Sequence, residues 1–224
     1  MLLKSTSETK GDGSKLATAY RYPVDFTESI YGNMTRDYQF PVVQTDYTTS
    51  NESLSVKTPF MQTANGGYFP KSTESKYNSA TSRERLTYQY NKYGNKVEEV
   101  KDGKEHVVYL YGYNHQEIIA VIMNATYADV TKALGSNVIQ AMESSTDLSK
   151  WKTTFETLRK SLPQARVFSY EHKPLVGISS VTAPDGLTTY YEYDELGRLS
   201  KAYQIHNGKR EVLKNYQYQY KTEK

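Results

Sequence analysis

Side chains suited to acid–base chemistry or metal binding are widely spaced in this sequence. The four histidines are separated by 9, 57 and 34 residues: His106, His115, His172 and His206. This spacing contains neither an HExxH motif nor two histidines one helical turn apart, which are the patterns typical of a zinc site. We therefore expect no metal site, and we interpret His115 as a turn residue.

Groups for nucleophilic or phosphate chemistry are equally scarce. The chain has no cysteine, which excludes disulfides, thiolate zinc sites and a cysteine nucleophile. It contains no G-x-S-x-G elbow, no P-loop and no G-x-G-x-x-G motif. Adjacent carboxylates such as Glu98-Glu99 would face opposite sides of a strand, whereas a glycosidase holds two carboxyls about 5–10 Å apart in a cleft. We expect no catalytic residue and no cofactor, and hence a protein that is not an enzyme.

The composition favours a soluble β protein rich in tyrosine. Tyrosine provides 22 aromatic residues, against six phenylalanines and one tryptophan, and its ring suits pleated, half-buried surfaces. The net charge is only +3 and the basic residues are scattered, which argues against nucleic-acid binding. No apolar run approaches the ~20 residues of a membrane helix, and the start lacks the apolar stretch of a secretory signal. We therefore expect no membrane insertion, and a chain that is either cytoplasmic or cut from a longer precursor.

Pairs of tyrosines that alternate with other residues indicate the strands that must position these rings. Tyr88 and Tyr90, Tyr109 and Tyr111, and Tyr191 and Tyr193 each share one face of a strand, because side chains alternate with a period of two. Turn signals separate the runs, at Asn65-Gly66-Gly67, Tyr93-Gly94-Asn95, Asp102-Gly103, Asp185-Gly186, Leu196-Gly197 and Asn207-Gly208. This pattern predicts an antiparallel meander.

One segment changes to a helical period. Within 127–162, apolar residues recur at helical spacing: Leu148, Trp151, Phe155, Leu158 and Leu162. Asp147 is the expected N-cap of this helix, Pro163 its stop and Gly135 the C-cap of an earlier one. The predicted fold is mainly β: a flexible segment over 1–19, β-hairpin repeats over 20–126, a helical insert over about 127–162 packed on a sheet face or edge, and further hairpins over 163–224, all in one continuous domain.

A sequence unit recurs in the hairpin regions. The clearest copy is Gly186-Leu-Thr-Thr-Tyr-Tyr191-Glu-Tyr193-Asp194-Glu-Leu-Gly197-Arg198-Leu199. A second copy, Tyr88-Gln-Tyr90-Asn91-Lys-Tyr-Gly94-Asn95, has Asn in place of the Asp and of the Arg. A third, Tyr109-Leu-Tyr111, keeps only the strand, and a fourth begins at Tyr216. The unit resembles the YD repeat of the Rhs family, which reads Gly, a short spacer, Tyr-x-Tyr-Asp-x-x-Gly-Arg-Leu.

The motif residues have a structural interpretation of their own. Asp194 is expected to accept backbone N–H groups of the following turn, Gly197 to permit the reversal, and Arg198 to pair with Asp194 or with a carboxylate on a neighbouring hairpin. Alternating tyrosines would pair across strands, at roughly 0.2–1 kcal/mol each. The structural motif residues are therefore Gly186, Tyr191, Tyr193, Asp194, Gly197, Arg198, Tyr88, Tyr90 and Gly94.

The resemblance extends to blocks outside the repeats. The segments Arg21-Tyr-Pro-Val-Asp-Phe26, Tyr109-Leu-Tyr-Gly-Tyr-Asn114, Asn124-Ala-Thr-Tyr127 and Lys173-Pro-Leu-Val-Gly177 are similar to YD-repeat proteins of Bacteroidetes. The resemblance implies a large secreted or cell-surface protein whose repeats form a β-sheet shell, which encloses a C-terminal toxin domain or serves adhesion. This chain would be a non-catalytic segment of that shell or scaffold, and its partners would be neighbouring repeats, with glycans or a downstream toxin domain as further partners.

The residues are also compatible with two other functions. The chain would be a stand-alone glycan- or protein-binding module if its tyrosine faces stack against ligands, and the candidates are Tyr109, Tyr111, Tyr191 and Tyr193. A weaker alternative is a role in enclosing or processing a toxin encoded downstream. An alanine substitution at Tyr191 and Tyr193 separates the first alternative from the structural role, because only a binding module would lose affinity while remaining folded.

Overall fold

The computed structural model describes residues 2–147 and 149–218, and its chain divides into two compact units, 1–106 and 107–224. The first unit contains an antiparallel sheet in the strand order β1-β2-β3-β4-β7-β8-β9 and a separate hairpin, β5-β6. The sheet strands are β1 (Ser5–Thr9), β2 (Lys15–Arg21), β3 (Gln44–Thr48), β4 (Ser53–Lys57), β7 (Ser72–Tyr77), β8 (Arg83–Tyr90) and β9 (Lys96–Lys101). The hairpin strands are β5 (Phe60–Gln62) and β6 (Tyr68–Pro70).

The small core of the first unit forms around a helix that the sequence pattern did not indicate. Helix α1 (Ser29–Arg36) follows the 3-10 turn η1 (Pro23–Asp25) and buries Tyr31 and Met34 against Val43. A two-turn helix buries only two positions three residues apart. Such a short pattern cannot be distinguished from a loop by periodicity, which is why no helix was expected in this region.

The segment 1–19, expected to be flexible, contains a regular antiparallel pair. Strands β1 and β2 pair from Ser5 opposite Ala19 to Thr9 opposite Lys15. The reason is a tight turn: Lys10 N–H donates to the Ser14 carbonyl (2.8 Å), and Gly13 takes the positive φ of 83° that this turn requires. Because many side chains of this strand pair are small and polar, the sequence has no apolar pattern there that would predict the two strands.

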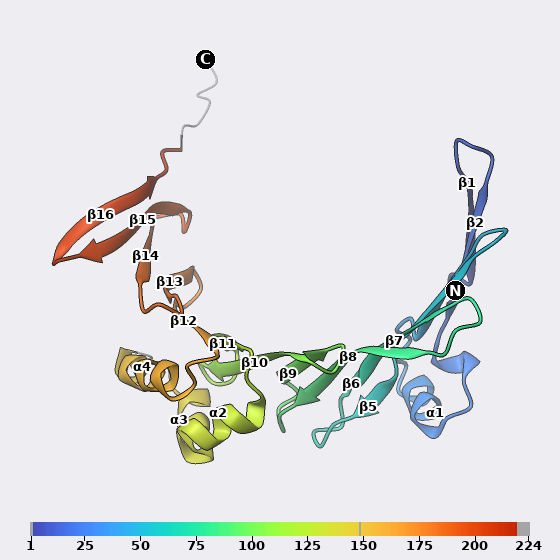
Figure 1. The fold of residues 1–224 in the computed structure, drawn as a ribbon, viewed down its shortest axis with the longest axis horizontal. Coiled ribbons are helices and arrows are strands. Elements are labelled where there is room, and N and C mark those ends of the chain that lie inside the picture. Colours follow the sequence, from blue (N-terminus) through green and yellow to red (C-terminus); the bar gives the residue numbers. More distant parts are fainter. Residues whose placement is uncertain (1, 148, 219–224) are drawn as a thin grey trace. The chain divides into compact units, whose positions relative to one another are not determined.

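The second unit has an uninterrupted antiparallel order of strands from β11 to β16, with β10 paired to β11. Its strands are β10 (Glu105–Gly112), β11 (Glu117–Met123), β12 (Arg166–Lys173), β13 (Gly177–Thr182), β14 (Thr188–Tyr193), β15 (Leu199–His206) and β16 (Lys209–Asn215). Between β11 and β12 lie α2 (Tyr127–Leu134), α3 (Ser136–Glu143), η2 (Ser149–Trp151) and α4 (Lys152–Ser161). In Figure 1 these helices gather beside β10 and β11.

The main core lies between these helices and one face of the sheet. Val108, Ile122 and Val167 of three adjacent strands are fully buried with Val130, Met142 and Leu158 of the three helices. Each such side chain contributes about 1.5–3 kcal/mol through its burial. The predicted helical insert on a sheet face is thus confirmed, as is the mainly β fold with its antiparallel hairpins. The single continuous domain expected from the sequence stays a prediction.

Local signals explain where the helices begin and end. Thr126 caps α2 by accepting from the Asp129 N–H (3.1 Å), and Gly135, with a φ of 85°, separates α2 from α3. Asp147 accepts from the Ser149 N–H (3.0 Å) at the start of η2, so its capping role falls on the 3-10 turn that precedes α4. Helix α4 ends at Ser161, two residues before Pro163.

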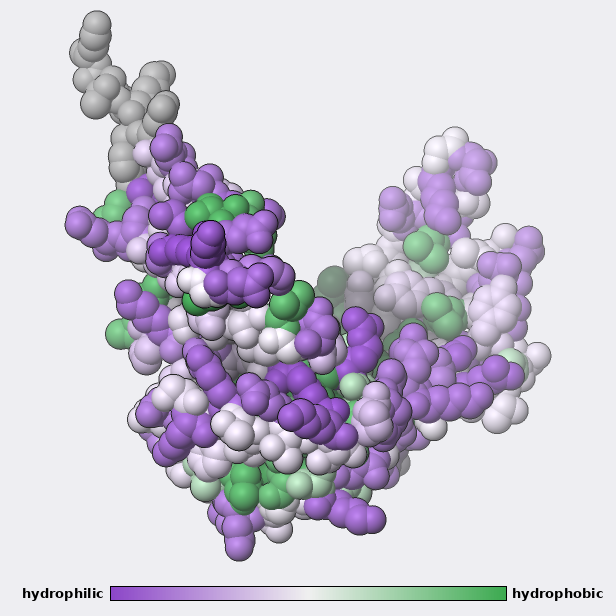
Figure 2. All heavy atoms as spheres, turned by 60° about the vertical axis from the view of Figure 1, so that its left-hand side comes forward, coloured by the Kyte–Doolittle hydropathy of each residue, from purple (hydrophilic) through white to green (hydrophobic). Residues whose placement is uncertain are grey.

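The surface is largely hydrophilic on the face that Figure 2 shows, with hydrophobic residues in separate small patches. Exposed apolar side chains of the β15-β16 hairpin include Ile205, Val212 and Leu213, each close to half exposed. None of the helices in the described part of the chain is long and apolar enough to cross a membrane.

Candidate functional site

The turn of the best-matching repeat is closed by hydrogen bonds of Asp194 and Gly197. Asp194 N–H donates to the Arg198 carbonyl (2.9 Å) and Gly197 N–H to the Asp194 carbonyl (3.0 Å). Oδ1 of Asp194 accepts from the N–H groups of Leu196 (3.0 Å) and Arg198 (2.9 Å). Gly197 has a φ of 73°, the left-handed conformation in which glycine meets no steric penalty. Asp194 thus accepts two backbone N–H groups of the turn that follows it.

Arg198 completes the turn through its side chain. Its Nε donates to Oδ2 of Asp194 (2.8 Å), and its Nη2 lies 2.7 Å from the same oxygen. Arg198 was expected to pair with Asp194 or with a carboxylate on a neighbouring hairpin, and the structure pairs it with Asp194. The hydrogen bond from Arg198, followed by those from backbone N–H groups, lowers the pKa of Asp194. The guanidinium also lies 4.2 Å from the ring centre of Tyr218 in the next copy.

Among the described residues, the same five-residue turn recurs at four other places. In each, the first N–H donates to the fifth carbonyl and the fourth residue, a glycine, donates back to the first carbonyl. The other turns are 10–14, 63–67, 91–95 and 183–187, with Gly13, Gly66, Gly94 and Gly186 in the left-handed region. In the second copy Asn91 accepts from the N–H groups of Tyr93 and Asn95, both at 3.0 Å. An asparagine therefore replaces the aspartate without loss of the two backbone bonds.

In three Tyr-x-Tyr pairs, 88/90, 109/111 and 191/193, the second tyrosine lies next to a β-bulge. The register of the paired strands shifts between Gln89 and Tyr90, between Leu110 and Tyr111, and between Glu192 and Tyr193. A bulge inserts one residue in the opposite strand and re-aims the side chains around it. The repeat thus specifies a strand, a bulge and a turn in fixed order.

Several tyrosines fasten one hairpin to backbone that precedes it. We call a hydrogen bond from a tyrosine hydroxyl to a carbonyl earlier in the chain a tyrosine clamp. Tyr193 donates to Ile178 (2.7 Å) and Tyr90 to Pro70 (2.9 Å). Burial raises the pKa of Tyr90 to about 12 and raises that of Tyr193. Tyr22 and Tyr218 form clamps to Leu3 (2.7 Å) and Leu199 (2.8 Å).

A close approach of ring and backbone accompanies the clamp at Tyr193. A Cβ added to Gly177 would lie 2.9 Å from the Tyr193 hydroxyl oxygen. Only a residue without a side chain fits beneath this ring at its present position.

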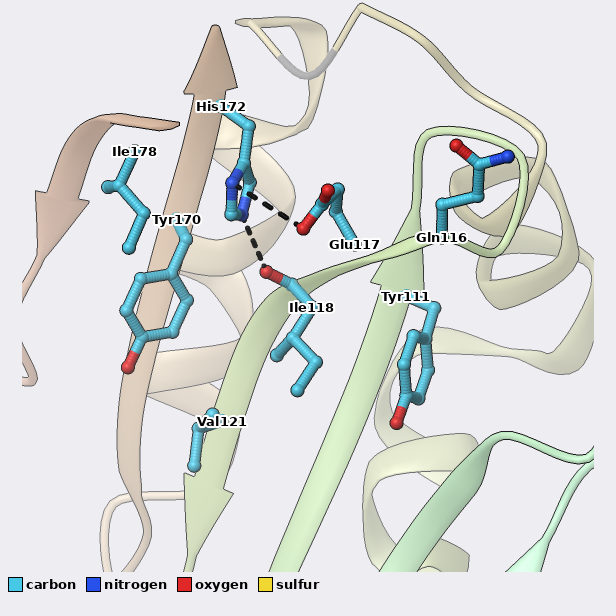
Figure 3. Close-up of a pocket in the computed structure, with 8 residues that line it drawn as sticks. All are labelled: Tyr111, Gln116, Glu117, Ile118, Val121, Tyr170, His172 and Ile178. Atoms are coloured by element: carbon cyan, nitrogen blue, oxygen red, sulfur yellow. Dashed lines mark hydrogen bonds and ion pairs between the residues drawn. The ribbon is translucent and has the colours of Figure 1, made fainter. Parts of the chain in front are cut away.

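One hollow of the second unit lies on the sheet face opposite the helices. It is shallow, with a volume of about 460 Å³. Tyr111 of β10 and Tyr170 of β12 flank it, with Ile118 and Val121 of β11 between them (Figure 3). At one end, Nε2 of His172 donates to the Ile118 carbonyl (2.9 Å). Two phenol rings around an apolar floor suit a flat ligand with polar edges.

Charged and amide groups lie at the same end of this pocket. Glu117 Oε2 is 3.8 Å from Nδ1 of His172, and Gln116 lies beside Glu117 on the hairpin between β10 and β11 (Figure 3). The hydroxyl of Tyr113 bridges the backbone of His172: it donates to the His172 carbonyl and accepts from the His172 N–H, both at 2.9 Å. This bridge holds β12 at its bulge between Glu171 and His172.

The hairpin that borders the pocket has a rare backbone conformation. Tyr113, Asn114 and His115 have φ angles of 51°, 56° and 66°, a region that costs L-residues roughly 1–2 kcal/mol each. The turn is held from outside, because Tyr113 N–H donates to the Ser145 carbonyl (2.7 Å) and His115 N–H to the Glu143 carbonyl (2.9 Å). His115 is thus a turn residue, as expected.

The candidates for ligand stacking do not gather in one place. Tyr111 lines the pocket, whereas Tyr109, two residues earlier on β10, is not among its lining residues, and Tyr191 and Tyr193 lie on β14. Sequence reasoning missed Tyr170, Glu117 and His172. The sequence carries one relevant signal, because Tyr170-Glu-His172 repeats the spacing of a Tyr-x-Tyr pair and its bulge.

Comparisons with known proteins give structural matches alone. No protein-family model matches the chain. No curated protein matches it. Among solved structures, it is similar to the crystal structure of TcdB2-TccC3-TEV, with 11% identity over 95% of this chain and a TM-score of 0.47. It is also similar to the crystal structure of TcdB2-TccC3, with 10% identity over 92% of this chain and a TM-score of 0.46. The chain spans only 12% of the length of each of these solved chains, and the likeness concerns the fold alone.

Proposed function

We propose that this chain is a non-catalytic structural segment of a larger secreted or cell-surface protein built from YD-type repeats. Within that protein it would form part of a β-sheet shell or scaffold, and its partners would be neighbouring repeats of the same polypeptide. The observation that carries this proposal is that three features recur in the hairpins: a β-bulge, a five-residue turn and a tyrosine clamp.

The groups that define the motif are used to hold the backbone. The Asp194 carboxylate receives two backbone N–H groups and the Arg198 side chain, and the Tyr193 hydroxyl is bonded to a carbonyl. A site that acted on a substrate would leave such groups directed at a cavity. Their use within the hairpin therefore supports an architectural role.

The arrangement of edge strands supports the same proposal. Strand β16 ends the strand order of its sheet, and all of its residues, Lys209–Asn215, are exposed. An exposed edge strand presents backbone groups that pair with a further strand. A neighbouring repeat would supply that strand.

Fractionation of the producing organism tests this proposal. Cytosol, envelope and medium would be probed with an antiserum raised against this chain. We expect a band far above the 25.7 kDa of the chain in the envelope or the medium. A single band at 25.7 kDa, or a signal confined to the cytosol, would contradict the proposal.

A second candidate function, glycan binding, rests on the pocket between Tyr111 and Tyr170. Its phenol rings and its Gln116 and Glu117 side chains offer stacking and hydrogen bonding to a sugar ring. A glycan array with the full chain tests it. Binding that disappears in Tyr111→Ala and persists in Tyr47→Ala, a substitution of an exposed tyrosine in the first unit, would favour this function. An array on which the chain binds no glycan would contradict this second function.

A further inference from the structure

A second cavity of the second unit, between α4 and the sheet, is lined by a half-buried cation that forms no ion pair among the described residues. Arg159 extends from α4 across β12 and β13. Its Nε donates to the Val167 carbonyl (3.1 Å), and its Nη2 donates to Oγ of Ser169 (2.9 Å) and to the Thr182 carbonyl (3.2 Å). All three acceptors are neutral. Within the described part of the chain, Arg159 forms no ion pair with a carboxylate.

Arg159 is half-buried, and its guanidinium has lost part of its hydration. Burial lowers the pKa of Arg159, while the more distant carboxylates of Glu156 and Asp185 raise it to a smaller extent. Charges removed from water are ordinarily paired, because hydrogen bonds to neutral groups replace only part of the lost hydration. The arrangement therefore favours a negatively charged partner.

The cavity beside Arg159 has the room and the donors for such a partner. Its volume is about 400 Å³, within the range of small-molecule sites. Lys160 also lines it and has no ion pair among the described residues. The other cation at the cavity, Lys152, is 3.3 Å from Glu171, and Glu156 is the one carboxylate in the lining. The free charge of the lining is thus positive.

Hydroxyl groups complete the lining with further donors. Oγ of Ser169 accepts from Arg159, so its own proton is available to a ligand. The hydroxyls of Thr182 and Thr188 lie 2.9 Å apart; one donates to the other, which leaves one proton for a ligand. Tyr190 lines the cavity as well. Guanidinium, ammonium and hydroxyl groups together are the donors that phosphate and sulfate oxygens receive.

Gly186 gives this cavity a link to the repeat motif. It lies in the lining, its φ is 87°, and a Cβ built on it would have no atom within 4 Å. The spacer glycine of the best-matching repeat thus borders the cavity.

We propose that the cavity between α4 and β13–β14 binds an oxyanion of the phosphate or sulfate type, held by Arg159 and Lys160. The anion would form the direct ion pair that the half-buried guanidinium does not have among the described residues. This site is separate from the pocket at Tyr111 and does not depend on the structural role proposed above.

Calorimetric titration of the full chain tests the site. The probes are inorganic phosphate, inorganic sulfate and glucose 6-phosphate, with glucose as the uncharged control, all at physiological chloride. We expect saturable binding of phosphate or sulfate and none of glucose. Tighter binding of glucose 6-phosphate than of phosphate would identify an ester as the ligand, and equal binding would identify the free ion. Absence of saturable binding of all three anions would overturn the proposal.

Two lysine variants locate the binding. Lys160→Gln removes a charged donor and should weaken binding roughly tenfold, since a hydrogen bond to a charged group is worth about 1.5–3 kcal/mol. Lys132→Gln changes an exposed lysine of α2 outside the cavity and should leave the affinity unchanged. Equal weakening in both variants would indicate non-specific attraction and overturn the site.

Arg159→Gln should abolish binding. Because Arg159 also joins α4 to the sheet, circular dichroism is used to check that the Arg159→Gln variant is folded. If this variant is unfolded, the affinity of Lys160→Gln decides whether the site binds the anion. The amide signal of Gly186 in a ¹H–¹⁵N spectrum gives a second readout: it should shift on addition of phosphate. A shift confined to residues distant from Gly186 would place the anion elsewhere and contradict the proposal.

Discussion

At the scale of single residues, the motif aspartate is a backbone cap with a charge partner. Oδ1 of Asp194 receives two N–H groups, and Oδ2 receives the Arg198 side chain. Asn91 keeps the first function in the second copy, where Asn95 replaces the arginine. The two copies thus separate the hydrogen-bonding role of this position from its charge.

The charge of Asp194 predicts how acid affects the stability of the folded chain. The folded-state pKa of Asp194 is lowered, so its stabilisation is complete above the unfolded value of about 3.9 and is lost as pH falls through the folded pKa. Asp194→Asn keeps the capping oxygen and lacks this charge. We expect a lower Tm than wild type at neutral pH and a difference that shrinks in acid. A difference independent of pH, measured by thermal denaturation, would show that the charge of Asp194 contributes nothing.

The tyrosine clamp predicts different costs for two tyrosines of one strand. Tyr193→Phe removes the hydroxyl that bonds to the Ile178 carbonyl and should lower the free energy of unfolding by about 1 kcal/mol. Tyr191→Phe is the matched control, because no hydrogen bond of its hydroxyl occurs within the described residues. Urea denaturation of both variants checks this. Equal stability of the two variants would contradict a role for the clamp.

At the scale of elements, the glycines of the five-residue turns decide where hairpins reverse. Gly197→Ala would force a side chain into a φ of 73° and should destabilise the fold by roughly 1–2 kcal/mol. Gly32→Ala, inside α1 with open space around the new Cβ, should stabilise it by about 0.5–1 kcal/mol. Opposite signs in the two urea midpoints are the expected result. Destabilisation by both substitutions would indicate that backbone conformation is not the cause.

The elements show which features could be predicted from the sequence. The turns and the helical insert were predictable because glycine positions and a helical period act over a few residues. The pair β1-β2 and helix α1 were not, since β1 and β2 are held mainly by backbone bonds and α1 buries only two side chains. The pocket at Tyr111 and Tyr170 joins residues on β10 and β12, and the register that brings them together depends on how the intervening insert folds.

At the scale of the whole molecule, the exposed edge at β16 predicts association. Its apolar side chains Val212 and Leu213 are about half exposed, as is Ile205 of β15. The isolated chain should associate at high concentration, since an unprotected edge pairs with another strand. Val212→Lys places a charge on this edge and should shift the chain toward monomer. Sedimentation velocity over a concentration series measures this, and a monomer at every concentration would contradict the prediction.

The clamps also bear on the order in which the hairpins can form during synthesis. Tyr22, Tyr90, Tyr193 and Tyr218 all reach back to carbonyls that precede them in the chain. As a ribosome releases the polypeptide, each of these four tyrosines therefore finds its acceptor already synthesised, whereas Tyr113 must wait for His172. An array of hairpins with such clamps can therefore close in order from its N-terminal end during synthesis.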